Sequence, residues 1–373
     1  MKIIDAARKS IYSWRIIFYH ITPRVWQKHV LLFIVTFFSM AWTYYFHSLG
    51  TSAFSRFLEA FSYAFVLSGI LLSHELGHYI HARQYGVEAT LPFFIPLPFL
   101  SPFGTLGAFI RMKSLPPDRR ALFDISYWGP AMSFFTSVPA IIAGLLLSEK
   151  VPVITTQSGF LVGDNDIVFG GSLLFDALAG LLINLPDGYT ILLHPIAFAG
   201  WVGLFVTAIN LFPIGQLDGG HLAYVFLGKR QKFLAYSFFG ILVFLALEVS
   251  QGWMFWIFML FLMGLRHPPV RMFESGVGLD KERIRQGILS VFIFILCFIP
   301  EPLKLNAKII TKPEMAPQFE MPRFDNFHEI NFTTSEKEVY YPFNAGKWET
   351  QWTDNASISP LNLKNSSVFT GVK

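Results

Sequence analysis

Long apolar runs recur along residues 29–300 of this chain, and they limit the folds that are open to it. The four longest are residues 29–50, 61–85, 121–147 and 194–213. A helix needs about 20 mostly apolar residues to cross the hydrocarbon core of a bilayer. Charged residues make up only 14% of the chain, whereas soluble domains carry about 25%. The chain is therefore predicted to be an all-α polytopic membrane protein.

Shorter apolar runs bring the expected number of transmembrane helices to about six to seven. These runs are 233–249, 252–265 and 287–300. The apolar segment 171–183 is too short to assign as a further span. Lys and Arg concentrate in the segments between the runs, at 1–28, 111–120, 228–232 and 266–286. All four basic segments can face the cytoplasm, or the stroma of a plastid, as the positive-inside rule requires.

One apolar stretch does not have the pattern of a helix. It is "LPFFIPLPFLSPFGTLGAFIRM", residues 91–112, and it has prolines at positions 92, 96, 98 and 102. Proline removes a backbone donor and clashes with the preceding turn of a helix. Irregular backbone at membrane depth must be buried in protein or line water. We therefore expect a membrane-embedded loop or hairpin in this stretch.

The chain is expected to have three parts. Residues 1–29 form a basic cytoplasmic N-terminus, and their six Lys and Arg without an early apolar core do not resemble a cleaved signal peptide. Residues 30–300 form the transmembrane domain, with its core at about 60–230. Residues 301–373 are polar and rich in Asn, and we expect a C-terminal tail on the opposite face. A net charge of +4 gives little reason to expect a nucleic-acid partner, and a single cysteine, Cys297, excludes intrachain disulfides.

Titratable residues interrupt the second apolar run in an H-E-x-x-H pattern, from His74 to His78. Positions i and i+4 lie on one face of a helix, so both imidazoles can bind one Zn²⁺. Glu75 can reach a metal-bound water and accept its proton. Ionisable residues inside a span usually serve function, because their burial in hydrocarbon must be compensated. The pattern therefore favours a zinc site over a chance pentapeptide.

A catalytic zinc needs a third protein ligand. His81 is on the same face, but it lies about 10.5 Å along the helix from His74. This distance disfavours His81 as a ligand of the same ion. We interpret His81 as marking the aqueous end of the helix. The better candidate is Asp218 in "NLFPIGQLDGGH", residues 210–221, where glycines allow close backbone approach to a hard oxygen ligand. Taken alone, the same residues also fit an ordinary Asp-Gly turn.

The two motifs together resemble the site-2 protease family of membrane-embedded zinc metalloproteases, over about residues 60–230. The second motif is N-x-x-P-x-x-x-L-D-G, from Asn210 to Gly219. "FGTLGAFIRM" and "GQLDGGH" resemble the branch with plastid and cyanobacterial members, without PDZ or CBS domains. The resemblance implies one zinc per chain, bound by His74, His78 and Asp218, with Glu75 as general base. It also implies that Asn210 positions the substrate or stabilises the oxyanion; an interhelical hydrogen bond is the alternative for this residue.

The implied activity is that of an intramembrane zinc endopeptidase, which cuts a peptide bond within or near a transmembrane segment of a single-span membrane protein. The host bilayer would be a bacterial, archaeal or plastid membrane, and the hairpin at 91–112 would hold the substrate extended by strand addition. One departure from the family pattern is Ser133, which stands where many relatives have Asn in G-P-x-x-N. His221 fits either a group that orients a ligand or an interface histidine. The alternatives are a catalytically silent membrane chaperone or binding protein, and a transporter, although we find no internal repeats.

Overall fold

The computed structural model describes residues 23–46, 48, 52–152, 160–162, 168–186, 189–265, 267, 278–304, 329–333 and 338–342. The chain divides into two compact units, Met1–Lys312 and Pro313–Lys373. In the second unit the described residues form one antiparallel hairpin, β8 (Glu329–Thr333) with β9 (Glu338–Pro342). Most of the expected N-terminal segment 1–29 and of the expected tail 301–373 lies outside the described residues.

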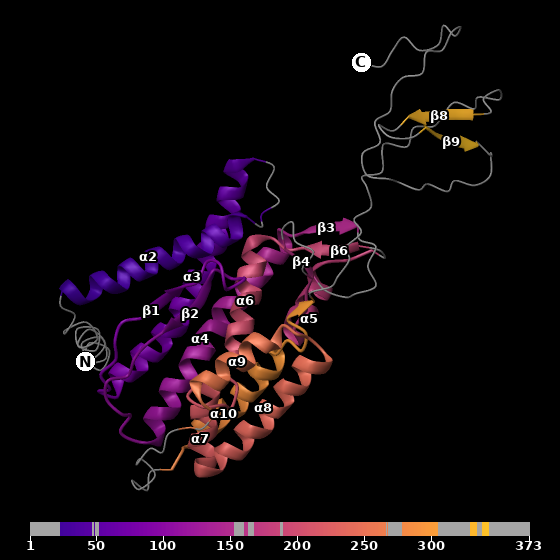
Figure 1. Cartoon of the computed structure of the whole chain (residues 1–373). Helices are drawn as coiled ribbons and strands as arrows, with labels where there is room; N and C mark the ends of the chain where they lie inside the picture. Colours follow the sequence, from indigo (N-terminus) through magenta and orange to yellow (C-terminus); the bar gives the residue numbers. More distant parts are fainter. Residues whose placement is uncertain are drawn as a thin grey trace. The chain divides into compact units, whose positions relative to one another are not determined.

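Helices make up most of the described part of the first unit (Figure 1). They are α2 (Pro23–Tyr45), α3 (Ala53–Gln84), α4 (Arg119–Leu146), α5 (Leu173–Leu182), α6 (Pro195–Asn210), α7 (Asp218–Leu227), the 3₁₀ turn η1 (Gly228–Arg230), α8 (Gln231–Glu248), α9 (Trp253–Met263) and α10 (Lys281–Cys297). Among the described residues, three helical stretches are long and apolar enough to cross a membrane, namely α3, α4 and the run Asp218–Glu248. The mainly helical, membrane-compatible fold is thus confirmed, and the number of six to seven spans stays a prediction.

The N-terminal ends of the long helices α3 and α4 are capped by side-chain hydrogen bonds. The Ser52 hydroxyl accepts from the backbone N–H of Ser55 at the start of α3. The Asp118 carboxylate accepts from Ala121 N–H at the start of α4. Such caps satisfy backbone donors that the helix itself leaves unpaired. They therefore fix where α3 and α4 begin, and the start of α4 is also where the connection that contains the hairpin ends.

A β-hairpin is present within residues 91–112. Its strands are β1 (Phe93–Pro96) and β2 (Thr105–Phe109), paired antiparallel. Hydroxyl donors from the neighbouring helices α2 and α3 bond to the tip of the hairpin. These bonds are Ser39 Oγ to Gly104 O (2.6 Å), Thr43 Oγ1 to Pro98 O (3.0 Å) and Tyr63 OH to Phe103 O (3.2 Å). The hairpin therefore lies alongside two helices of the membrane domain, as Figure 1 shows.

A small mixed sheet departs from the all-α expectation. Its strands, in spatial order, are β3 (Glu149–Pro152), β6 (Tyr189–Leu192), β4 (Phe160–Leu161), β5 (Val168–Phe169) and β7 (Leu303–Lys304). Strands of two to four residues are too short to show the period-two alternation that identifies a strand in sequence. The segment 171–183 forms α5, whose ten residues span about 15 Å, half of a hydrocarbon core of about 30 Å.

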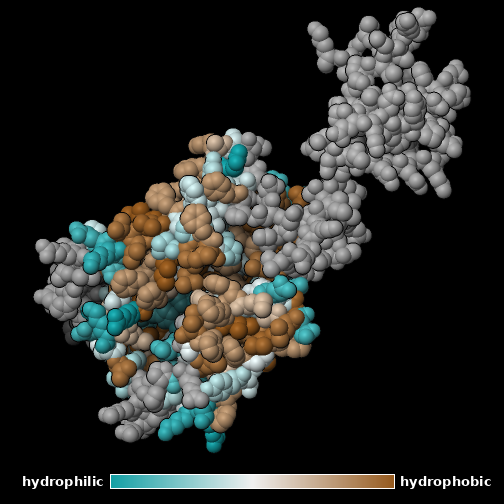
Figure 2. All heavy atoms as spheres, in the orientation of Figure 1, coloured by the Kyte–Doolittle hydropathy of each residue, from teal (hydrophilic) through white to brown (hydrophobic). Residues whose placement is uncertain are grey.

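The surface carries many apolar side chains, as the brown areas of Figure 2 show. On α8, Phe233, Phe244 and Leu247 are each at least 60% exposed. Contiguous apolar surface of this kind is uncommon on soluble monomers.

The helix α6, by contrast, is buried along nearly its whole length, and its Trp201 and Phe205 are fully enclosed in an aromatic cluster. This central helix carries Asn210 at its C-terminal end.

One arginine connects α10 to the ends of α3 and α4. Arg283 makes two bonds to the Asp124 carboxylate, Nε to Oδ1 at 2.9 Å and Nη2 to Oδ2 at 2.5 Å, and a third to the Tyr85 hydroxyl at 3.0 Å. Tyr85 in turn donates to Asp124. The three groups join three helices in one network.

Arg283→Ala is expected to lower the free energy of unfolding by about 3 kcal/mol, because it leaves the buried Asp124 carboxylate without its counter-ion. The matched control is Arg285→Ala on the same helix, where the arginine is 76% exposed and pairs with Glu282. This control should cost less than about 0.5 kcal/mol. Denaturant unfolding in detergent micelles measures both values. Equal costs for the two variants would contradict the prediction.

Candidate metal centre and active site

Three predicted ligands lie together at the junction of α3 and α7. The Nε2 atoms of His74 and His78 are 3.0 Å apart, and Asp218 Oδ2 is 3.4 Å and 3.3 Å from them. Both histidines are buried, and the Asp218 side chain is 12% exposed. Three ligand atoms about 2.1 Å from one tetrahedral ion would be about 3.4 Å apart. The spacing of these atoms therefore fits three ligands of a single small cation.

The second nitrogen of each histidine has a partner that orients the ring. His78 Nδ1 is 2.7 Å from the backbone carbonyl of Ile125, which can only accept, so Nδ1 carries the proton. His74 Nδ1 is 3.1 Å from the hydroxyl of Ser133. Because Ser133 Oγ also donates to the Pro130 carbonyl, it can accept from His74. Both Nε2 atoms then present lone pairs toward Asp218, the arrangement that metal-binding histidines need.

The polar atoms at this centre fit a bound cation. Asp218 Oδ2 and Glu75 Oε2 are buried without a hydrogen-bond partner among the described residues. Two imidazole lone pairs 3.0 Å apart repel each other unless a positive charge lies between them and the carboxylate. Two nitrogen donors and one carboxylate oxygen match the ligand set of a catalytic zinc, which leaves a fourth position for water or substrate. The residues present therefore fit the ion that the H-E-x-x-H pattern predicts.

Glu75 lies next to the ligands but is not one of the metal group. Its side chain is buried, and its carboxylate accepts a hydrogen bond from the backbone of Ile110, the residue that follows β2. The end of the hairpin is therefore docked against this glutamate. With one oxygen held and the other without a hydrogen-bond partner in the described part of the chain, the carboxylate is fixed in place and still able to accept a proton.

Asn210 ends α6 beside the first ligand. Its amide Nδ2 is 3.5 Å from His74 Nε2, and the residue is half-buried. An amide donor at this distance from the ligand atoms can reach a group bound at the centre. The position agrees with either role considered for Asn210, an oxyanion donor or an interhelical contact.

A turn rich in glycine brings Asp218 to the histidines. Gly215 adopts φ +55°, and its N–H donates to the carbonyl of Leu265 at 3.1 Å. A Cβ at Gly219 would lie 2.0 Å from the Leu211 carbonyl oxygen, so no larger residue fits there. The chain therefore reverses between α6 and α7 within a few residues, and Asp218 becomes the first residue of α7.

The two other predicted histidines lie outside the metal group. His81 Nδ1 bonds to the Gly77 carbonyl at 2.9 Å, and its ring stacks on Trp128 at 5.0 Å. His221 Nδ1 is 2.7 Å from Nε2 of His267. This contact joins the start of α7 to the segment after α9, and the half-buried His221 agrees with either role considered for it, a group that orients a ligand or an interface histidine. The geometry agrees with the exclusion of His81 as a ligand.

The family is decided by a match that includes the three proposed ligands, Glu75 and Asn210. Residues 62–247 match the model of Peptidase family M50. These residues are an M50 domain. The match confirms the resemblance to site-2 proteases that the two motifs indicated. The M50 domain contains His74, Glu75, His78, Asn210 and Asp218, whereas α10 and its Arg283 lie beyond it.

Relatives of the M50 domain occur in plants. A rice protein named "Probable zinc metalloprotease EGY1, chloroplastic" is 34% identical over 254 residues, which are 65% of this chain and 41% of that protein. Its Arabidopsis thaliana namesake is 38% identical over 173 residues, 45% of this chain and 30% of the relative. "Probable zinc metalloprotease EGY2, chloroplastic" of Arabidopsis thaliana is 29% identical over 243 residues, 64% and 41% respectively. The chain thus spans about two fifths or less of the length of these relatives. No solved structure matches.

Sequence reasoning missed several residues that shape the centre. They include the Ile125 carbonyl behind His78, and Gly129, whose missing side chain makes room for the His78 ring. A backbone carbonyl leaves no mark in a sequence. Gly129 stands in "WGPAMS", where the only signal was the family motif that also contains Ser133.

Ser133→Ala is expected to weaken zinc binding about tenfold, because it removes the oxygen that holds His74 Nδ1 and so loosens the ring. The matched control is Ser137→Ala, a buried hydroxyl one turn later that bonds to the Ser133 carbonyl and not to a histidine. Competition with a zinc chelator measures both affinities. Equal affinities in the two variants would contradict a role for Ser133 in orienting His74.

Proposed function

We propose that this protein is an intramembrane zinc endopeptidase that hydrolyses a peptide bond within or near a transmembrane segment of a membrane-protein substrate. One observation carries the proposal. The ligand atoms of His74, His78 and Asp218 lie within 4.8 Å of one another, on and beside a helix long enough to span a membrane, in an M50 domain. The names of the relatives, which include "zinc metalloprotease", support zinc as the metal.

Each residue of the centre has a proposed task. His74, His78 and Asp218 hold one zinc, which when bound would polarise the scissile carbonyl and lower the pKa of a water. Glu75 takes the proton of the attacking water on its unpartnered oxygen and then delivers it to the leaving amide nitrogen. Asn210 directs its amide N–H toward the carbonyl oxygen as negative charge develops there.

The depth of the centre supports cleavage inside the bilayer. His78 and His74 lie about 9 Å and 15 Å along α3 from its end at Gln84. We propose that about six to seven helices of residues 30–300 form the membrane domain, with residues 1–29 as its basic N-terminus and 301–373 as a polar C-terminal tail. A chloroplast membrane is the proposed location, because the relatives are named chloroplastic.

The hairpin supports a way of presenting a substrate. A helical substrate hides its peptide bonds, so the scissile segment must become extended. The strand β1 packs against α2, while β2 leads into Ile110, whose backbone bonds to Glu75. A single-span substrate paired along β2 would therefore run toward the general base. Main-chain pairing of this kind gives affinity without requiring a particular sequence.

Metal removal tests the proposed function. The full chain is reconstituted in liposomes with a single-span reporter protein, and fragments are identified by mass spectrometry. Stripping zinc with a chelator should abolish cleavage, and adding one equivalent of zinc should restore it. A chelator already saturated with zinc is the control. Unchanged cleavage in zinc-free protein would overturn the mechanism, and full zinc without any cleavage would favour the silent membrane chaperone.

A further inference from the structure

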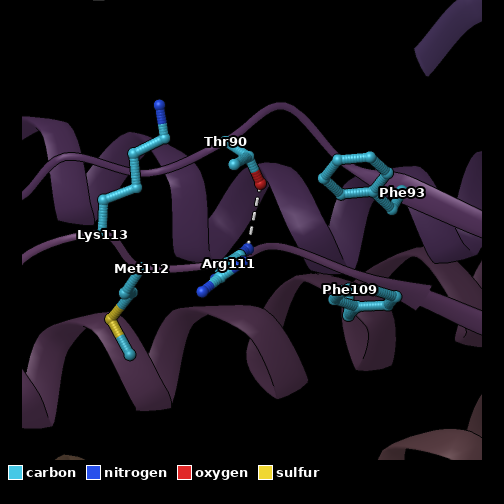
Figure 3. Close-up of a pocket in the computed structure, with 6 residues that line it drawn as sticks. All are labelled: Thr90, Phe93, Phe109, Arg111, Met112 and Lys113. Atoms are coloured by element: carbon cyan, nitrogen blue, oxygen red, sulfur yellow. Dashed lines mark hydrogen bonds between the residues drawn. The ribbon is translucent and has the colours of Figure 1, made fainter. Parts of the chain in front are cut away.

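The base of the β1–β2 hairpin holds an open cavity of about 430 Å³ that the proposed mechanism does not use. Its lining residues are Thr90, Phe93, Phe109, Arg111, Met112 and Lys113 (Figure 3). None of them belongs to the metal group. Arg111 and Lys113 are exposed, and neither takes part in the ion pairs of the described residues. The lining residues therefore offer two positive charges and no carboxylate. The nearest acidic residue in the pairing is the exposed Glu88 opposite Lys113, whose backbone N–H donates to the Glu88 carbonyl at 2.7 Å.

Strand pairing explains why these side chains share a face. Phe109, Arg111 and Lys113 alternate along one chain, and alternate residues of an extended segment point to the same side. On the facing segment of the hairpin, Phe93 pairs with Phe109, and Thr90 Oγ1 accepts from the backbone N–H of Arg111 at 3.0 Å. The Phe93 and Phe109 rings stack with centroids 5.6 Å apart. Figure 3 shows the aromatic pair at one end of the cavity and the Lys113 chain at the other, with Arg111 between them.

The position of the cavity places it at the membrane surface. The hairpin tip bonds to Tyr63, and residues 63–84 of α3 cover about 30 Å, the thickness of a hydrocarbon core. The hairpin base therefore lies at the level where α3 ends and α4 begins. Two further cations, Arg119 and Arg120, start α4 at this level. Leu115, close by in the chain, is 75% exposed.

We propose that this cavity binds the headgroup of an anionic lipid. The Arg111 guanidinium and the Lys113 ammonium would contact the phosphate or sulfonate oxygens, for which the planar guanidinium offers two parallel donors. The stacked rings of Phe93 and Phe109 would pack against the glycerol and the upper acyl chain. Basic pockets at the surface of a membrane domain are suited to such headgroups. The cavity lies on the face of the hairpin and not along its edge, so a lipid there leaves β2 open to a substrate strand.

The test compares two variants that remove the same charge. Arg111→Gln with Lys113→Gln alters the cavity, whereas Lys229→Gln with Arg230→Gln removes an exposed basic pair in η1. Delipidated full-length protein in detergent is titrated with short-chain phosphatidylglycerol or phosphatidylcholine, and bound lipid is counted by native mass spectrometry. The cavity variant should bind phosphatidylglycerol about tenfold more weakly than the wild type, and the η1 variant within about twofold. Phosphatidylcholine binding should be the same in all three proteins.

Two further arms distinguish other anions from a lipid. Glycerol phosphate, which has the headgroup charge without acyl chains, should not compete at millimolar concentration. An acidic peptide should not compete either. Equal loss of phosphatidylglycerol from both variants would overturn the proposal, as would competition by glycerol phosphate or by the acidic peptide. The substitutions are at exposed positions, and thermal unfolding in detergent checks that both variants stay folded.

Discussion

Glu75→Gln is expected to lower the rate of peptide-bond cleavage on the order of 10³-fold, while zinc content stays near one ion per chain. Glutamine keeps the shape of the side chain and can keep the contact with Ile110, but it cannot take a proton from water. The ligands His74, His78 and Asp218 are untouched by this change. Loss of cleavage without loss of metal is the pattern expected of a general base and not of a ligand.

The measurement combines reporter cleavage in liposomes with zinc analysis of the same preparation. Glu248→Gln is the matched control, because this glutamate also belongs to an apolar helix, but it is the last residue of that helix, is exposed and is distant in sequence from both motifs. It should cleave at the wild-type rate. If the Glu75 variant kept a tenth of the activity or more, Glu75 would not be the base; if it lost zinc, its assignment as a non-ligand would be wrong.

The local part of the centre could be predicted because helix geometry determines it. Any helix that contains His74 and His78 brings their rings to one face, and Glu75 must lie beside them. The position of Asp218 could not be derived in this way. It depends on the packing of α7 against α4 and on the turn at Gly215, and only the likeness to a known family linked the two motifs.

The parts of the fold that were missed depend on short or backbone-only interactions. The strands of the mixed sheet are two to four residues long, so their own sequences carry too little pattern to identify them. They pair with strands that are distant in the sequence, and this pairing depends on the tertiary fold. The hairpin was predictable because its prolines excluded a helix, whereas its contacts with Ser39 and Tyr63 were not. The Ile125 carbonyl, which orients His78, belongs to a residue whose side chain has no part in the site.

The helices α3 and α4 approach each other closely at two glycines, Gly77 and Gly129, beside the metal centre. A Cβ at Gly129 would lie 2.1 Å from His78 Nε2 and 2.2 Å from Cε1 of the same ring. A Cβ at Gly77 would lie 2.3 Å from the Trp128 carbonyl oxygen. At such short distances the neighbouring atoms must move. For Gly129 the neighbour is the ring of His78, a proposed ligand, and for Gly77 it is the backbone of α4. Gly77 on α3 and Gly129 on α4 thus allow the two helices to approach closely while the His78 ring keeps its place between them.

Gly129→Ala is therefore expected to displace the His78 ring and to weaken zinc binding at least 100-fold, with reporter cleavage lost in parallel. Gly69→Ala is the matched control, since this glycine lies on α3, and among the described residues no atom beyond its own helix backbone and chain neighbours lies within 4 Å of an added Cβ. It should bind zinc and cleave like the wild type. Zinc analysis, cleavage and thermal unfolding are measured on both proteins, and the Gly77→Ala variant tests the same contact from the other helix. If both Gly129→Ala and Gly77→Ala bound zinc with wild-type affinity, the helices would be free to separate, and the close approach would not be what holds His78 in place.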